Sequence, residues 1–582
     1  MFAKVLVANR GEIAARIIRT CADLGIASVA VFSDVDADAL HVRLADEAVP
    51  LGGTTAADSY LDMARIIQAA KDSGAVAVHP GYGFLAENAG FAQGVAEAGL
   101  TFIGPSAEVI AAMGEKIRAR AVATEAGVPQ VPGTGRISGP AEVLAFGAEH
   151  GYPIVIKASC GGGGRGMRTV QRPDDAESAL RAARQEADAA FGCDDVYLER
   201  YLTAARHIEV QVFADTHGRA VWLGDRDCSV QRRHQKLVEE APAPGLAAEL
   251  RSAMGEAAVR LVRHVGYLGA GTVEYLVQGD RFYFLEMNTR IQVEHTVTEE
   301  VLGLDLVAEQ LAVAAGAPLS VPEGDLAPRG HSIECRINAE DTAGGRFLPS
   351  AGPIDSLTVP ARAGVRFDQG YEAGDTVPPY YDSMIGKLIV WAPTREMAVR
   401  RGQAALRELI VAGPPTTIPA LQTILANPQF ISGLVTTGWL ESAVTFAEET
   451  EAGPRSAEEF GAKREEVVVL GQRYVIPRFD ADGRPTGTST TSQASLLRGR
   501  IRPAPHGTPG VVSSPMQGVL VGVDAAVGTP VTADQVLFVV EAMKMQNQVR
   551  AGIDGVVTEV AAAKGEAVST GTLLARVEPA AH

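Results

Sequence analysis

The C-terminal seventy residues contain an internal repeat. Residues 516–541 align without a gap on residues 553–578, so that Gly518 corresponds to Gly555 and Leu537 to Leu574. Each copy alternates apolar and polar residues in short runs separated by glycine, which is typical of β-strands and tight turns. Two equivalent halves of this kind predict a pseudo-symmetric, all-β sandwich. This repeat is the strongest constraint that the sequence places on the fold.

One lysine lies between the two halves. Lys544 occurs in "EAMKM", in the short connection that follows the first half, where we expect an exposed turn. A solvated lysine at the end of a strand is the ordinary alternative. The position between the two repeats favours a specific role.

Length and composition limit the possible classes of protein. At 582 residues the chain is long enough for three to five domains. Its 46% hydrophobic and 21% charged residues are typical of a soluble globular protein, and its net charge of −18 argues against binding nucleic acid or acidic membranes. No signal peptide or bilayer-spanning run is evident, so we expect a cytoplasmic protein. Five cysteines without a CxxC indicate neither a disulfide framework nor a zinc site.

The rest of the chain divides by pattern. Residues 1–113 alternate strands and helices, which predicts a doubly wound α/β domain, although "ANRGEIA" is not a GxGxxG motif. Residues 114–320 and 330–440 read as mixed α+β. Residues 441–466 are acidic, 467–477 predict a small hairpin, and 480–510 have the Gly, Ser, Thr and Pro content of a linker.

A glycine-rich stretch, "KASCGGGGRGMRTV" (157–170), follows a predicted strand. Glycines let the backbone approach an anion closely and direct its N–H groups at phosphate oxygens. The stretch lacks the GK[ST] ending of a P-loop, and by itself it is equally compatible with a flexible turn. Lys116 and Lys157 could supply positive charge to a nucleotide.

A compact basic cluster follows in "RDCSVQRRHQKLVEEAPAP", which contains Gln231, His234 and Lys236. Because the chain is acidic overall and aromatic residues do not interleave with the cluster, RNA binding is disfavoured. A bicarbonate or phosphate site fits better.

The run "EMNTRIQVEH" places polar residues at every second position from Glu286 to Glu294. Strand geometry puts at least Glu286 and Asn288 on one face. With Glu274 from the neighbouring predicted strand they offer oxygen ligands that suit Mg²⁺. A strand with one solvated polar face is the alternative.

The repeat with "EAMKM" at its centre resembles the biotinyl domains of biotin-dependent carboxylases. This resemblance implies that Lys544 carries biotin as an amide on its Nζ. The lipoyl domain has a related fold and also a lysine at a hairpin tip, but the methionines on both sides of Lys544 favour biotin.

Residues 1 to about 440 resemble the ATP-grasp module of biotin carboxylase, through "ANRGEIA", "HPGYGFLAEN", "RGHSIECRINAED" and "PPYYDSMIGKL" as well as the stretches above. The implied domains are a Rossmann-like N-terminal domain (1–113), an ATP-grasp domain with a glycine-rich lid (114–325), a C-terminal carboxylase domain (326–445), a linker and possible partner-docking segment (446–510) and the carrier (511–579).

The resemblance also implies roles for individual residues. ATP would be bound by Lys116, Lys157, Gly162, Gly163, Gly164, Gly166, Glu199, His207, Gln231 and His234; Mg²⁺ or Mn²⁺ by Glu274, Glu286 and Asn288; bicarbonate by Lys236, Arg290, Gln292 and Val293; Glu294 would be the general base and Arg336 would stabilise negative charge on phosphate and biotin. Lys236, Arg290, Glu294 and Arg336 form the expected catalytic set. Cys160 and Thr296 depart from the family pattern, which usually has glycine and proline there.

The function implied is that of the α subunit of an acyl-CoA carboxylase. It would use ATP and bicarbonate to carboxylate biotin on Lys544, and a separate carboxyltransferase subunit would pass the carboxyl group to acetyl-CoA or propionyl-CoA. A biotin protein ligase and a hetero-oligomeric assembly follow from this expectation. The alternatives are a subunit of pyruvate carboxylase or a related carboxylase, a carbamoyl-phosphate-type ligase, and a non-catalytic biotin carrier or scaffold.

Overall fold

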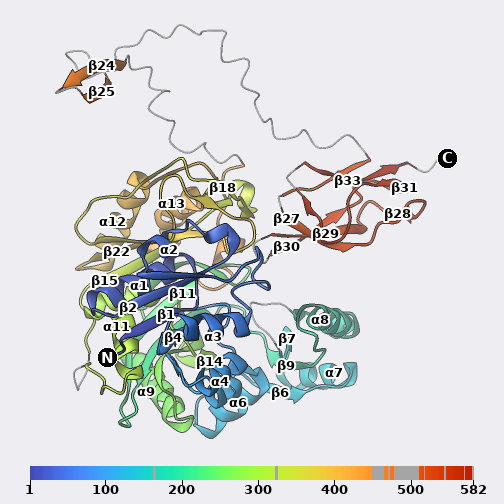
Figure 1. Cartoon of the computed structure of the whole chain (residues 1–582). Helices are drawn as coiled ribbons and strands as arrows, with labels where there is room; N and C mark the ends of the chain where they lie inside the picture. The colour runs from blue at the N-terminus through green and yellow to red at the C-terminus, as the bar shows by residue number, and fades with distance from the viewer. Residues whose placement is uncertain are drawn as a thin grey trace.

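The structure is a computed structural model of the whole chain (Figure 1). It describes residues 1–160, 166–321, 326–448, 464–469, 472–477, 510–516, 518–542, 545–568 and 571–579. No helix within these ranges is long and apolar enough to cross a membrane.

The N-terminal segment forms a five-stranded parallel sheet in the order β3-β2-β1-β4-β5, which confirms the α/β prediction. Strands β1, β2 and β4 are largely buried apolar runs, as expected of a parallel sheet with covered faces, whereas the edge strand β3 is largely exposed. The elements are β1 (Lys4–Val7), α1 (Gly11–Asp23), β2 (Ala27–Phe32), α2 (Leu40–Leu44), β3 (Glu47–Pro50), α3 (Met63–Asp72), β4 (Ala77–His79), α4 (Ala89–Glu97), β5 (Thr101–Phe102), α5 (Ala107–Gly114) and α6 (Lys116–Glu125).

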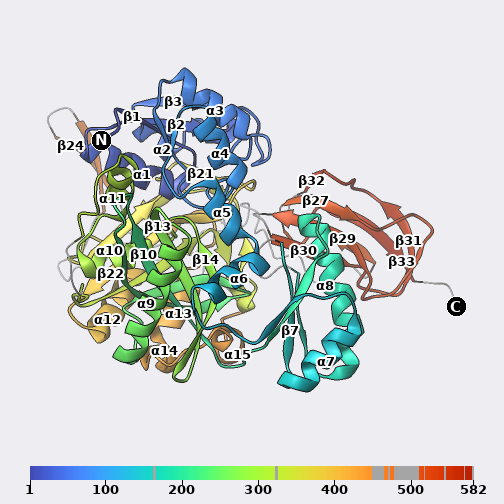
Figure 2. The same cartoon turned by 90° about the horizontal axis from the view of Figure 1, so that it is seen from below.

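A second sheet, in the order β6-β9-β7-β8, forms a small lobe with helices α7 and α8 beside the main body (Figure 2). The apolar sides of α7 and α8 pack on the strands through Val143, Phe146, Leu180 and Ala183. The elements are β6 (Gly133–Arg136), α7 (Pro140–His150), β7 (Ile154–Ala158), β8 (Met167–Val170), α8 (Ala176–Phe191) and β9 (Val196–Arg200).

The largest sheet has eight strands in the order β14-β13-β10-β11-β12-β15-β22-β20. It runs across the expected boundary at residue 325, because β12 pairs with β15 and brings Glu239 opposite Glu334. Residues from both sides of that boundary therefore share one sheet. The elements are β10 (Arg206–Ala214), β11 (Ala220–Arg232), β12 (Gln235–Ala241), α9 (Ala248–His264), β13 (Gly269–Gln278), β14 (Arg281–Asn288), α10 (His295–Leu302), α11 (Leu306–Ala314), β15 (His331–Asn338), β20 (Val365–Gln369) and β22 (Met384–Ala392).

Short elements complete the region up to residue 448. Helices α12 and α13 cover the far strands of the large sheet with a core that includes Leu388, Leu406 and Leu421. The elements are β16 (Glu340–Asp341), β17 (Leu348–Pro349), β18 (Gly352–Pro353), β19 (Ser356–Thr358), β21 (Thr376–Val377), α12 (Arg395–Glu408), β23 (Ile410–Ala412), α13 (Ile418–Ala426), α14 (Pro428–Ile431) and α15 (Trp439–Ala443). The predicted hairpin is present as β24 (Arg464–Val469) paired with β25 (Gln472–Pro477).

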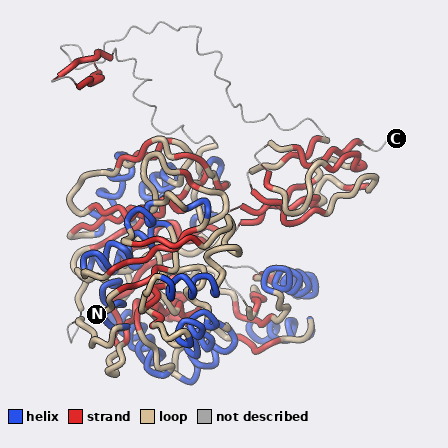
Figure 3. The backbone as a smooth tube through the Cα atoms, viewed as in Figure 1, coloured by secondary structure: helices blue, strands red, loops and turns tan. Residues whose placement is uncertain are grey.

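The C-terminal repeat forms two four-stranded sheets, β26-β33-β31-β28 and β30-β29-β27-β32 (Figure 3). The predicted symmetry is confirmed, since Gly518 pairs with Val568 in one sheet and Gly555 with Val531 in the other. Leu537, Phe538 and Leu574 lie in the shared core. The elements are β26 (Val511–Ser513), β27 (Gly518–Val523), β28 (Pro530–Val531), β29 (Val536–Ala542), β30 (Met545–Arg550), β31 (Gly555–Val560), β32 (Ala567–Val568) and β33 (Leu573–Glu578).

Strands β29 and β30 form a hairpin in which Ala542 pairs with Met545. Lys544 lies between these two residues in the sequence but outside the described residues. The exposed turn expected there stays a prediction.

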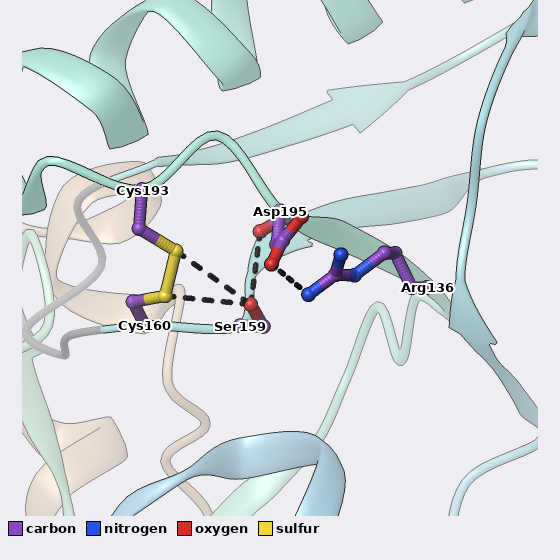
Figure 4. Close-up of a disulfide and its surroundings, with 5 residues drawn as sticks. All are labelled: Arg136, Ser159, Cys160, Cys193 and Asp195. Carbon is purple, nitrogen blue, oxygen red and sulfur yellow. Dashed lines mark hydrogen bonds and ion pairs between the residues drawn. A yellow bond between two sulfur atoms is a disulfide. The ribbon is translucent and has the colours of Figure 1, made fainter.

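One sequence-based expectation about cysteine is wrong. The structure pairs Cys160 with Cys193 in a disulfide, with their Cα atoms 6.4 Å apart (Figure 4). The two residues are 33 positions apart in sequence. Pairing of β7 with β9 brings the end of one strand to the start of the other, and a count of cysteines does not reveal such a contact.

Candidate active site

A cavity of about 430 Å³ lies between the lobe and the large sheet. It is lined by most of the residues selected from the sequence, drawn from both sides of residue 325. They are Lys116, Lys157, Glu199, His207, Gln231, His234, Lys236, Glu274, Glu286, Asn288, Arg290, Gln292, Val293, Glu294 and Arg336.

The selected glycines are the exception. Gly162, Gly163 and Gly164 lie outside the described residues, and Gly166 does not line the cavity. Gly166 has a φ of +69°, and a Cβ there would lie 2.8 Å from the Cβ of Ala158. Both facts require glycine at this position.

The lobe side of the cavity carries an ion-pair chain. Glu199 on β9 accepts from Lys157 Nζ at 2.5 Å and also from Arg120 on α6 at 2.5 Å. Lys157 and Glu199 are largely buried, which strengthens their attraction. This arrangement holds the lysine at the cavity wall, where a phosphate group could compete for it.

On the opposite side of the cavity, Lys236 on β12 contacts several acidic side chains. Its ammonium contacts the carboxylates of Glu209, Glu274 (3.1 Å) and Glu294 (2.6 Å). Burial raises the pKa of Glu209 to about 7, with Lys236 opposing the effect. Each of the three carboxylates is therefore held near a positive charge in the buried wall of the cavity.

Glu294 is buried at the N-terminal end of α10 and lies between two cations. Its Oε1 accepts from Lys236, and its Oε2 accepts from Arg336 at 2.8 Å. Burial alone would raise the pKa of the Glu294 carboxyl, but Lys236 and Arg336 hold it below its ordinary value. The side chain is therefore an ionised carboxylate at neutral pH, able to accept a proton.

The expected metal ligands come together. Glu274 and Glu286 are direct cross-strand partners on β13 and β14, and Asn288 donates to Glu274 at 2.8 Å. Burial, together with the charge of Glu274, raises the pKa of the Glu286 carboxyl. Two adjacent carboxylates and an amide oxygen fit a divalent cation that binds oxygen ligands.

His207, Glu209 and Glu274 form a second group of converging donors. His207 Nε2 lies 2.9 Å from Glu274, and Lys236 contacts both carboxylates. Since Lys236 already supplies positive charge to this group, the Glu286 side of Glu274 is the better place for a metal ion.

The alternating pattern seen in the sequence ends at Asn288, where β14 ends. Residues 289–294 form a turn that leads into α10 and is fixed by side chains from other parts of the chain. Arg290 Nε donates to Glu87 at 2.8 Å, and the buried Lys387 on β22 donates to the carbonyl of Val293 at 2.8 Å. The cavity residues after Asn288 are thus positioned by a braced loop and not by strand geometry.

Sequence reasoning missed the buried layer under the cavity. Arg226, which is fully buried, donates to Glu209, Gln211, Thr272, Gln292 and Thr298, and Glu239 accepts from Arg336 at 2.6 Å. Glu209 follows His207 by two positions on β10, so strand alternation could have indicated it. Arg226 gave no such signal, because its partners come from four different elements.

Four family models match the chain in succession. They are described as biotin carboxylase, N-terminal domain (residues 1–110), carbamoyl-phosphate synthase L chain, ATP binding domain (115–321), biotin carboxylase C-terminal domain (334–442) and biotin-requiring enzyme (510–577).

Individual relatives agree with this order. A biotin-dependent acyl-coenzyme A carboxylase alpha3 subunit from Mycobacterium leprae is 46% identical over 99% of this chain and 98% of its own length. A pyruvate carboxylase subunit from Methanothermobacter thermautotrophicus is 49% identical over 76% of this chain and 90% of its own length.

A solved structure agrees as well. The biotin carboxylase domain of a Hydrogenobacter thermophilus 2-oxoglutarate carboxylase, in complex with MgADP, ADP and bicarbonate, is 47% identical with a TM-score of 0.73. The match covers 76% of this chain and 97% of that domain.

Proposed function

Because this chain belongs to the family of biotin-dependent acyl-CoA carboxylase alpha subunits, and is a biotin carboxylase, we propose that its cavity carboxylates biotin with ATP and bicarbonate. The observation that carries the proposal is the position of Glu294, buried as an ionised carboxylate between Lys236 and Arg336. A carboxylate between two fixed cations suits a reaction in which a base removes a proton from bicarbonate and nearby cations stabilise the negative charge that develops.

The nucleotide binds on the lobe side. Lys157 leaves its ion pair with Glu199 in part and contacts the phosphates of ATP, with Lys116 as the second cation. Fixed positive charges stabilise the charge that spreads over the transferred phosphoryl group. Glu199, His207, Gln231 and His234 complete the nucleotide site.

Bicarbonate binds at Lys236 with the side chains of Arg290 and Gln292 and the backbone of Val293. Glu294 removes its proton as it attacks the γ-phosphorus, because bicarbonate itself is a weak nucleophile. The carboxyphosphate formed would break down to phosphate and CO₂, and biotin, when bound, would supply the ureido nitrogen that takes up this CO₂ while the phosphate takes the nitrogen's proton. Arg336, held by Glu239, stabilises the negative charge that develops.

Glu274, Glu286 and Asn288 fit Mg²⁺ or Mn²⁺, which would neutralise charge on the nucleotide phosphates. The MgADP and bicarbonate bound to the H. thermophilus domain support this assignment of ligands to the cavity. Lys544 carries biotin in the C-terminal sandwich.

We further propose acetyl-CoA or propionyl-CoA as the final acceptor, reached through a separate carboxyltransferase subunit in the cytoplasm. The M. leprae relative matches nearly the whole chain, including the carrier, whereas the pyruvate carboxylase relative matches 76% of it. Residues 446–510 remain the proposed linker and docking segment, and most of them lie outside the described residues. Biotin protein ligase would attach the biotin.

The test is ADP release by the purified chain with free biotin, with and without bicarbonate, together with the intact mass. We expect biotin-stimulated, bicarbonate-dependent turnover that falls about 10²–10⁴-fold in Glu294→Gln. Lys544→Arg should lose the mass of the biotin adduct and keep turnover with free biotin. With the carboxyltransferase partner present, acyl-CoA and not pyruvate should be carboxylated.

An adduct without any bicarbonate-dependent turnover would leave only the carrier or scaffold function. Carboxylation of pyruvate in place of acyl-CoA would instead support the second candidate function, that of a pyruvate carboxylase subunit.

A further inference from the structure

The disulfide between Cys160 and Cys193 (Figure 4) closely follows Lys157 and Ala158, which line the proposed nucleotide site. Cys160 lies two positions after the end of β7 and three positions beyond Lys157, and Cys193 precedes β9, which carries Glu199. The bond thus joins the ends of the two strands whose side chains form the Lys157–Glu199 ion pair.

Ser159 connects the disulfide to the cavity. Its hydroxyl lies 3.6 Å from Cys160 Sγ and 3.9 Å from Cys193 Sγ and donates to the carbonyl of Asp195. Its own carbonyl accepts from the backbone N–H of Lys116 at 3.4 Å. A change at the sulfur atoms therefore reaches Lys116 and Lys157 through one residue.

The two cysteines differ from the others in access. Cys160 and Cys193 are half-buried, whereas Cys21, Cys228 and Cys335 are buried. Burial raises the pKa of Cys21 to about 12, which keeps that thiol protonated and unreactive. The accessible pair is the one that an external thiol can reach.

We propose that Cys160 and Cys193 form a redox modification site whose disulfide state sets the affinity of the cavity for the nucleotide. The inference rests on the proposed function, because it takes the cavity to be the nucleotide site. Disulfides are rare in a reducing cytoplasm, and those that form there are usually transient or redox-sensing. The cytoplasmic location proposed above therefore favours a reversible bond over a permanent structural one.

The chemistry is thiol–disulfide exchange with a dithiol. One thiolate of the dithiol attacks a cysteine sulfur, the Sγ–Sγ bond breaks, and a mixed disulfide forms. The second thiol of the reagent then displaces the remaining cysteine thiolate. The protein gains two electrons and two protons as two thiols, and the dithiol becomes a disulfide.

The disulfide is the state that binds the nucleotide more tightly. It fixes Ser159 against Asp195 and so holds the backbone on both sides of the Lys157–Glu199 pair. A site held in its binding geometry loses less freedom when it binds a ligand. Reduction should raise the Kd for ADP by about three- to tenfold, since only the local ordering changes.

The experiment measures binding of ADP with Mg²⁺ to the full-length chain by calorimetry, after treatment with oxidised glutathione or with dithiothreitol. Alkylation and intact mass then count the thiols, with three expected in the oxidised chain and five in the reduced chain. Cys193→Ser should bind ADP with the weaker affinity of the reduced chain under both conditions. Cys21→Ala, which leaves the pair intact, should respond as the wild type does.

Equal ADP affinity in the oxidised and reduced chains would overturn the inference, as would five free thiols after oxidation. A redox response that persists in Cys193→Ser would also overturn it. Failure to bind ADP in either state would instead reject the proposed nucleotide site, so the two failures are distinguishable.

Discussion

The carboxylase cavity and the carrier sandwich are held together by different interactions. Below the cavity, Arg226, Glu209 and Glu239 are completely buried, and each is paired with an oppositely charged side chain. In the described part of the carrier, Ser514 is the one buried polar side chain, and the core is made of Val, Leu, Ala, Met and Phe. The carboxylase region thus buries charged side chains in pairs, whereas the described part of the carrier is stabilised by apolar packing.

The two regions should therefore fail differently. A buried charge that loses its partner is strongly destabilising and also displaces its neighbours. A shortened apolar side chain leaves a cavity whose effect stays local. The following substitutions and the change of pH test this difference between the two regions.

Arg226→Met should have the largest effect, because it removes the arginine that pairs with the buried Glu209 and supports Gln292. Loss of one partner of a buried pair costs about 3–5 kcal/mol of unfolding free energy. Bicarbonate-dependent ADP release should fall together with the urea midpoint of the carboxylase region. Arg362→Met is the control, since Arg362 pairs with Glu408 at the surface and should change neither quantity.

A stable Arg226→Met chain with normal turnover would contradict the contrast. It would mean that an apolar residue replaces the buried charge layer without loss, as hydrophobic substitution does in some buried ion-pair clusters.

Leu537→Ala tests the carrier side. Leu537 is fully buried in the sandwich core, and truncating such a leucine costs about 2–5 kcal/mol. The carrier should unfold at lower temperature and accept less biotin, while ADP release with free biotin stays unchanged. Val527→Ala, at a position 65% exposed, is the matched control and should leave the carrier stable. Loss of turnover with free biotin in Leu537→Ala would show that the two regions are coupled.

Lowering the pH should destabilise the carboxylase region through a buried histidine, an effect that the carrier lacks. His41 is buried beside Arg10, Asp36 and Arg43 and contacts the carbonyl of Val31; burial, with the two arginines, lowers its pKa to about 4. The unfolded chain, with a histidine pKa of about 6.5, binds the proton first, so stability is lost as the pH falls from about 6.5 to 4. The full loss is at most about 3 kcal/mol.

The measurement is the urea midpoint of the carboxylase region between pH 7.5 and 4.5. In His41→Asn the urea midpoint should depend less steeply on pH, because unfolding of this variant takes up one proton fewer. His264→Asn, at an exposed histidine, should keep the slope of the wild type. The carrier, whose residues 511–579 contain no histidine, should show no corresponding change over this range. Identical slopes for His41→Asn and the wild type would contradict the assignment to His41.

The same contrast explains how much the sequence could predict. The carrier fold and its symmetry followed from the repeat, because alternation and glycine turns are local signals. The residues selected for the cavity do lie together around one cavity, but the buried residues that support them were not predicted. Arg226, Glu239 and Lys387 act across strands distant in the sequence, and the Cys160–Cys193 bond depends on the pairing of β7 with β9. Such contacts are set by the tertiary fold.

Thr296 was noticed in the sequence, but its contact could not be predicted from the sequence. The sequence identified it only as a departure from the family's proline, and the structure gives it a partner. Its hydroxyl donates to the buried carboxyl of Glu334, which faces Glu239 across β12 and β15. Burial, with Glu239 adding to it, raises the pKa of Glu334 well above its ordinary value.

Thr296→Val should therefore have the smallest effect of the four changes. It removes one buried hydrogen bond at nearly constant volume, which costs about 1 kcal/mol of unfolding free energy. Because Glu239 positions Arg336, turnover should also fall about two- to fivefold, while the KM for ATP stays unchanged. Thr296→Ser keeps the hydroxyl and should restore turnover. If the Ser and Val variants have the same turnover, Thr296 acts through packing and not through its hydrogen bond. Glu334 would then have no part in positioning Arg336.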